Sequence, residues 1–135
     1  MLNPSKADAS IDDPTLRRCI GFAKSWGFGS LNVINLFAYR SAKPSELRQV
    51  NDPVGTQNDR YLKKAIKSAD KVVVACGNNG KLMQRDRMVL DLLSIYNVQP
   101  YCLGITKAGY PRHPLYVMSS KQPSSYKSYL AFKSP

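Results

Sequence analysis

Lys71-Val72-Val73-Val74-Ala75-Cys76 is the stretch that decides the fold, and Gly77-Asn78-Asn79-Gly80 follows it directly. A near-continuous run of β-branched and small apolar residues is typical of a parallel strand that helices cover on both faces. The glycines and asparagines after it indicate a tight turn. We therefore expect a central strand at 71–76, with a functional edge of the sheet where that strand ends.

Patterns of helical spacing lie on both sides of this strand. Asp13-Pro14 predicts the start of a helix, whose apolar positions recur as far as Trp26. A second helix is expected to begin near Asn58, and a third is expected over 82–96.

Two further apolar stretches, 31–39 and 101–105, read as strands. Alternating strands and helices predict an α/β fold of three layers, α/β/α, with a short, mainly parallel sheet. We expect residues 1–118 to form this single domain. Residues 119–135, rich in Ser, Lys, Tyr and Pro, are expected to form a basic C-terminal tail.

The charge balance is strongly positive. The chain of 135 residues has 20 Lys and Arg against 9 Asp and Glu, a formal net charge of +11. Such an excess attracts polyanions, so DNA or a nucleotide is the expected partner. The alternative is a charge that only keeps an ordinary enzyme in solution.

Composition also limits the other classes of function. Three widely spaced cysteines, no CxxC motif and one histidine predict neither a disulfide framework nor a metal site, and we expect no cofactor. No signal peptide and no apolar segment of about 20 residues is present, which favours a cytoplasmic protein outside the membrane.

Loops at the carboxyl ends of parallel strands should meet at one edge of the sheet. There Asn3 could hold its amide toward a ligand, Asp8 could activate water, and His113, flanked by prolines, could exchange a proton near neutral pH. Each also has a plainer interpretation, as a turn residue, a solvated acid or a surface histidine. The expected substrate-binding residues are Ser5, Asn35, Tyr39, Arg40, Gly77, Asn78, Lys107 and Arg112.

Several ordered motifs resemble those of the bacterial and phage family catalogued as domain of unknown function 1643. They are MLNPSKAD (1–8), DDPTLRRCIGFA (12–23), VINLFAYR (33–40), NDPVG (51–55) with Asn58-Asp59, and LGITKAGYPRHPLY (103–116). This family implies no activity.

The chain is more distantly similar to the uracil-DNA glycosylase-like superfamily, through Asn3-Pro4-Ser5, Gly77 and His113-Pro114. That resemblance implies hydrolysis of an N-glycosidic bond in DNA. Asn3 or Asp8 would orient the attacking water, and His113 would support the departing base after the base is flipped out. Tyr39 is a candidate to stack on that base.

Two other functions stay open: a non-catalytic protein that binds nucleic acid or a nucleotide, and an enzyme acting on a free nucleotide or nucleoside. The start of the chain raises a separate question. Only Met1 and Leu2 precede the Asn3 loop, too few for a central strand. We therefore expect that the chain as given is truncated, that its start codon is placed late, or that the sheet lacks most of this strand. The exposed edges of neighbouring strands would then need covering, and a second subunit in a homodimer could cover them.

Overall fold

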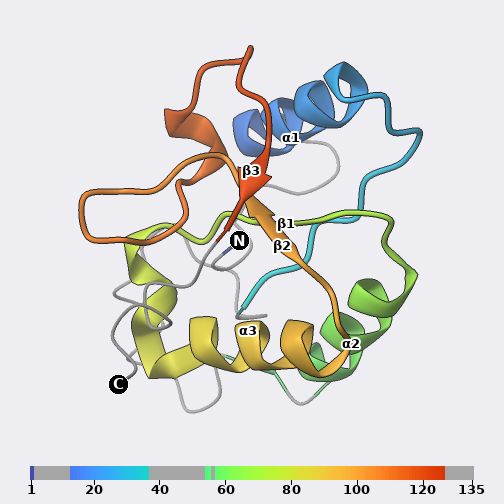
Figure 1. Ribbon diagram of the computed structural model, residues 1–135, viewed down its shortest axis with the longest axis vertical. Coiled ribbons are helices and arrows are strands. Elements are labelled where there is room, and N and C mark those ends of the chain that lie inside the picture. Colours follow the sequence, from blue (N-terminus) through green and yellow to red (C-terminus); the bar gives the residue numbers. More distant parts are fainter. Residues whose placement is uncertain (2–12, 37–53, 56, 127–135) are drawn as a thin grey trace.

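The structure is a computed structural model that describes residues 1, 13–36, 54–55 and 57–126. Among the described residues, helices and strands follow in the order α1, α2, β1, η2, α3, β2, η3, β3, where η marks a 3-10 helix. Figure 1 shows the three strands in the middle, with α1 on one side and α2 and α3 on the other.

The first two helices begin where the sequence predicts. Helix α1 spans Pro14–Ser25, and the Asp13 carboxylate caps it by accepting the backbone N–H groups of Thr15 (2.9 Å) and Leu16 (3.2 Å). Helix α2 spans Asn58–Ser68 and turns Leu62 and Ile66 into the core.

The third helix begins later than expected. Helix α3 spans Arg85–Ile95, and the 3-10 helix η2 (Asn78–Gln84) precedes it. Met83 and Gln84 have positive φ angles, 52° and 56°, which breaks the helical path between the two elements. The expected helix over 82–96 is thus shortened at its N-terminus.

The sheet is small. Strand β1 (Val72–Val74) pairs in parallel with β2 (Pro100–Cys102), and β2 pairs antiparallel with β3 (Ser124–Ser125). The described sheet is therefore mixed rather than mainly parallel. Helices and strands together agree with an α/β fold.

Residues 31–36 form no strand, so the prediction of a strand over 31–39 is wrong for this part, and 37–39 lie outside the described residues. A ladder needs a neighbouring strand, and the only backbone partner of this segment within the described residues is Met1.

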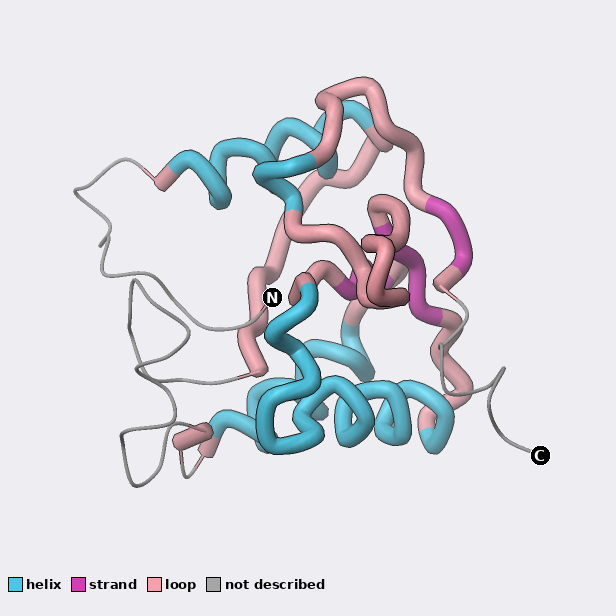
Figure 2. Tube along the Cα trace, turned by 90° about the vertical axis from the view of Figure 1, so that its left-hand side faces the viewer, coloured by secondary structure: helices cyan, strands magenta, loops and turns pink. Residues whose placement is uncertain are grey.

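The core divides between the two faces of the sheet. On one face Leu36, Leu62, Ile66, Val89 and Leu93 pack together, with Val72 and Val74 against them. On the other face, Phe22 of α1 packs with Leu103 and Val117, with Val73 against them. The valines of β1 thus alternate between two helical layers, which Figure 2 shows above and below the strands.

The segment after Met118 is docked as far as Tyr126. Strand β3 lies in it, and the Tyr126 side chain is buried, with its hydroxyl donating to the Gly109 carbonyl oxygen (3.5 Å). Burial raises the pKa of Tyr126 to about 12. The domain boundary at residue 118 stays a prediction. No described helix is long and apolar enough to cross a membrane.

Candidate functional site

The loops that follow β1 and β2 meet at the carboxyl ends of these strands. The backbone N–H of Gly77 donates to the Pro111 carbonyl oxygen (2.8 Å), and Thr106 Oγ1 donates to Asn78 Oδ1 (2.6 Å). We call residues 76–78 and 104–113 the loop cluster. It joins the turn after the central strand to the segment that carries the single histidine.

The second loop of the cluster folds back on itself. Ile105 and Pro111 form an isolated antiparallel bridge, the Thr106 N–H donates to the Tyr110 carbonyl oxygen (2.8 Å), and the Arg112 N–H donates to the Gly104 carbonyl oxygen (2.9 Å). These bonds return the chain to the sheet edge and fix the backbone just before His113.

Glycine is required where the first loop turns. Gly77 has φ +72°, and a side chain there would lie 3.9 Å from the Cβ of His113. Gly80 faces Cys76, and an added Cβ at this position would overlap the Cys76 sulfur. The turn therefore lies close to both His113 and the end of β1.

His113 is half-buried, and its surroundings define its chemical state. Its Nδ1 accepts the backbone N–H of Leu115 (3.3 Å), so the neutral ring carries its proton on Nε2. Burial, and then the positive amino terminus of Met1, lower the pKa of His113, while Asp13 raises it by a smaller amount. Near neutral pH the ring is thus a neutral donor at Nε2.

Asn35 lies on the segment beside Met1. Its backbone carbonyl oxygen accepts the side-chain amide of Asn58 (2.9 Å), and its own Oδ1 is buried without a hydrogen-bond partner among the described residues. A buried amide oxygen without a partner is unusual and is consistent with a group that receives a ligand or a water.

Two cysteines, Cys19 and Cys76, lie within the electrostatic influence of the Met1 amino group. Burial raises the pKa of the Cys76 and Cys19 thiols, an effect that the positive Met1 amino group partly offsets. Both thiols therefore stay protonated near neutral pH and are poor nucleophiles.

A buried arginine, which the sequence did not indicate as part of a site, anchors the neighbouring segment. The Arg85 side chain is only 7% exposed. Its Nε donates to the Leu36 carbonyl oxygen (2.9 Å), and its Nη2 pairs with Asp59 (2.6 Å). Asn58 donates to the same Leu36 oxygen (3.1 Å). The structure places Arg85 at the first position of α3, the end of a helix that disfavours a positive charge, and nothing in the sequence indicated this because the helix was expected to begin at 82.

The structure brings together only some of the predicted site residues. Gly77, Asn78 and His113 lie in the loop cluster. Arg112 is exposed, with its side chain over Gly104, and Lys107 is exposed at the turn. Five predicted site residues lie outside the described residues, namely Asn3, Ser5, Asp8, Tyr39 and Arg40.

No group of three or more metal-ligating side chains occurs within the described part of the chain. One protein-family model, described as "Protein of unknown function (DUF1643)", matches residues 1–115. No curated protein matches, and no solved structure matches.

Proposed function

The chain belongs to the DUF1643 family, and we propose that it binds nucleic acid at the loop cluster and hydrolyses an N-glycosidic bond there. The description of the family assigns no activity, so the proposal is argued from the residues of this chain.

The observation that carries the proposal is the state of His113. Its Nδ1 accepts the Leu115 N–H, and its lowered pKa keeps the ring neutral, so Nε2–H is available as a donor at the sheet edge. When an N-glycosidic bond breaks, the base leaves with the bonding electron pair. A neutral donor beside the leaving base stabilises that developing negative charge.

The remaining roles follow from the sequence. In the proposed reaction, the oxygen of a water molecule bonds to C1′ of the sugar as the bond from C1′ to the base nitrogen breaks. Asn3 orients the water and Asp8 accepts its proton, while the departing base takes its hydrogen bond from His113. Gly77 lies close to His113 with its N–H bonded to Pro111, and the Asn78 side chain is held in the same loop cluster by Thr106.

The other proposed substrate-binding residues would contact the base and the phosphate groups. Asn35 would offer its buried Oδ1 and Tyr39 would stack on the base. The phosphate groups would be bound by Ser5, Arg40, Lys107 and Arg112.

The test is release of a base from DNA. Oligonucleotides carrying uracil, hypoxanthine or modified pyrimidines are incubated with the protein, and alkali then cleaves any abasic site. We expect His113→Gln to reduce the rate at least about 100-fold, the usual contribution of a positioned proton donor. Lys24→Gln, which removes an exposed charge from α1, should leave the rate within about twofold.

Asn3→Ala should also reduce the rate, because the attacking water would lose its orienting amide. Absence of abasic product from every substrate would overturn the proposed hydrolysis. It would leave the second candidate, nucleic-acid binding without turnover.

A specific surface favours that second candidate. Arg60, Lys63, Lys64 and Lys67 follow one another at helical spacing along α2, are all exposed, and line one surface hollow of about 400 Å³. We call them the α2 basic stripe. Four cations on one helix face suit a row of phosphates.

The stripe is tested by the salt dependence of binding to single-stranded DNA. The slope of log K against log salt is negative. Replacing Arg60, Lys63 and Lys64 with Gln should make it less steep by about 2, since each phosphate contact contributes about 0.7 to its magnitude. The matched control removes three exposed charges elsewhere, at Lys24, Arg87 and Lys121. Equal slopes for both triple variants would rule out the stripe as a binding surface.

A further inference from the structure

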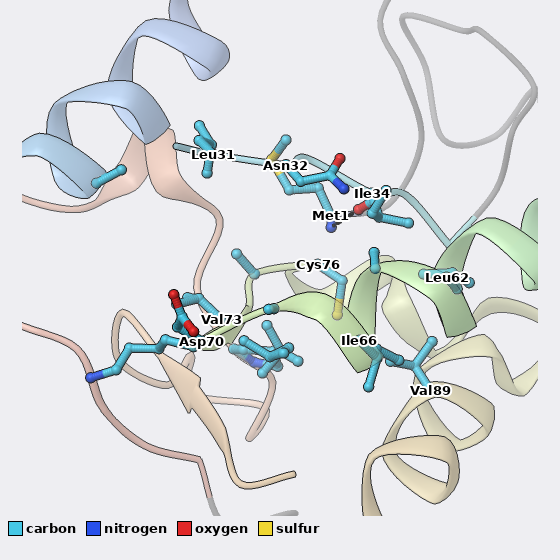
Figure 3. Close-up of a pocket in the computed structure, with 18 of the residues that line it drawn as sticks. Met1, Leu31, Asn32, Ile34, Leu62, Ile66, Asp70, Val73, Cys76 and Val89 are labelled. Carbon is cyan, nitrogen blue, oxygen red and sulfur yellow. Dashed lines mark hydrogen bonds between the residues drawn. The ribbon is translucent and has the colours of Figure 1, made fainter. Parts of the chain in front are cut away.

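A cavity of about 460 Å³ separates the 28–36 segment from β1. Both helical layers line it. Trp26 lies on the α1 side, and Ile66 and Val89 lie on the side of α2 and α3, while Ile34 and Val73 form its two flanks. In Figure 3, Met1 and Ile34 lie on one side of the opening, and Val73 and Cys76 lie on the other. We call this cavity the slot.

Met1 lies at one end of the slot and is already paired like a residue of a parallel strand. Its amino group donates to the Ile34 carbonyl oxygen (3.0 Å), and its own carbonyl oxygen accepts the Leu36 N–H (2.9 Å). One residue bonding to both neighbours of Asn35 is the pattern of a parallel ladder. The direction of a strand that ends at Met1 is thereby fixed.

The opposite flank of the slot offers backbone groups that have no partner among the described residues. The Tyr126 N–H donates to the Pro100 carbonyl oxygen (2.9 Å), so the backbone groups of Pro100 point to β3 and those of Tyr101, the next residue, point to β1. Tyr101 lies opposite Val73 in the register. The N–H and C=O of Val73 therefore point away from β2 into the slot, and the same alternation, continued one residue past the end of β1 at Val74, directs those of Ala75 the same way.

The slot is also short of apolar contacts. Val72, Val73 and Val74 are only half-buried, although helices are present on both faces of the sheet. Among the described residues, β1 is an edge strand with β2 as its single neighbour. A valine-rich strand with an open edge is otherwise a hazard for aggregation.

A charged amino group is unfavourable at the position that Met1 takes at the end of the slot. It is buried, and desolvation lowers its pKa. A peptide N–H at the same position would donate to Ile34 in the same way and would carry no charge.

We propose that the slot is a strand position and that an extended apolar segment joined to the amino group of Met1 fills it, as residues preceding Met1 in a longer form of the chain. The added strand runs parallel to both flanks. Because alternate residues of a strand point to opposite sides, the residue before Met1 directs its backbone groups toward Val73 and Ala75.

The structure favours this occupant over a second copy of the chain. A strand from another subunit would have to end against the Met1 ammonium group, whereas an attached segment removes that charge. An attached strand would also fix the backbone only two residues before Asn3, at the start of the proposed catalytic loop.

The test compares the 135-residue chain with two extended forms. One carries Thr-Val-Ile-Val-Val before Met1, and the matched control carries Ser-Gly-Ser-Gly-Ser. The apolar extension should raise Tm by on the order of 5 °C. It should also slow hydrogen exchange at the Val73 and Ala75 amides by at least tenfold, while the control extension changes neither.

Equal Tm and equal exchange for the two extensions would overturn the proposal. So would an apolar extension that leaves the Val73 and Ala75 amides unprotected while the protein self-associates. If the unextended chain forms a dimer in which these two amides are already protected, the occupant is a second copy and the proposal is wrong.

Discussion

The imidazole of His113 is oriented by local backbone. Pro114 follows it at the start of η3 (Pro114–Tyr116), and the Leu115 N–H within η3 occupies Nδ1. Tyr116 lies beside the ring, with 5.8 Å between the ring centroids. The ring thus has one nitrogen committed to the fold and one available as a donor.

The lowered pKa of His113 predicts how stability depends on pH. The unfolded chain takes up a proton near pH 6.5, whereas the folded state takes it up only at lower pH. The contribution of His113 to stability is therefore fully present above pH 6.5 and is lost as the pH falls through the folded pKa.

Urea unfolding measured from pH 7.5 down to 5 checks this, with His113→Gln as the comparison. The wild type should lose more stability than the variant over this range. Parallel pH profiles for the two proteins would contradict the assignment.

Arg85 gives a second prediction at the scale of one residue. Arg85→Met removes one of the two donors to the buried Leu36 carbonyl oxygen and leaves Asp59 without its ion pair. Asp59 is 46% exposed and regains water, and Asn58 still donates to the Leu36 oxygen, so we expect a loss of about 2 kcal/mol in the free energy of unfolding, mainly from the lost hydrogen bond between the guanidinium and that carbonyl. The exposed Arg87→Met on the same helix should cost less than about 0.5 kcal/mol. Equal losses would show that the buried pair contributes nothing.

At the scale of elements, the turn from β1 into η2 depends on close contact between Cys76 and Gly80. Gly80 is buried, and its backbone lies against the Cys76 side chain. The same turn presents Gly77 to His113. Packing at Gly80 and geometry at the candidate site are therefore coupled through four residues.

Gly80→Ala should destabilise the protein by about 1–3 kcal/mol, because the new methyl group overlaps the Cys76 sulfur. Cys76→Ala frees that space, so Gly80→Ala should cost much less in the Cys76→Ala background. A thermal or urea double-mutant cycle measures the difference. Additive losses would mean that the two side chains do not compete for one space.

Local signals in the sequence predicted the elements that depend on local chemistry. Asp13-Pro14 predicted the start of α1, and Asn58 the start of α2, because capping and helical spacing act within a few residues. The valine run predicted β1 in the same way.

Elements that depend on distant partners were harder to predict. Residues 31–36 have strand-like composition but form no strand, and Ser124–Ser125 form a strand although their composition indicated a tail. The proximity of Gly77 and His113 followed from a topological rule. The burial of Arg85 depends on where Leu36 and Asp59 arrive in space, which no local pattern encodes.

At the scale of the whole molecule, the α2 basic stripe and the candidate site lie on different elements. The α2 basic stripe follows a helix packed on one face of the sheet, while the loop cluster lies at the carboxyl ends of β1 and β2. Binding at the stripe alone predicts dependence on salt without dependence on His113. Binding at the loop cluster predicts both.

The most direct test of the loop cluster is NMR with ¹⁵N-labelled protein and short single-stranded DNA at low salt. We predict saturable shifts that are largest at the Gly77 and Asn78 amides and the His113 imidazole. Shifts confined to Arg60, Lys63, Lys64 and Lys67, or no shifts at all, would contradict the account.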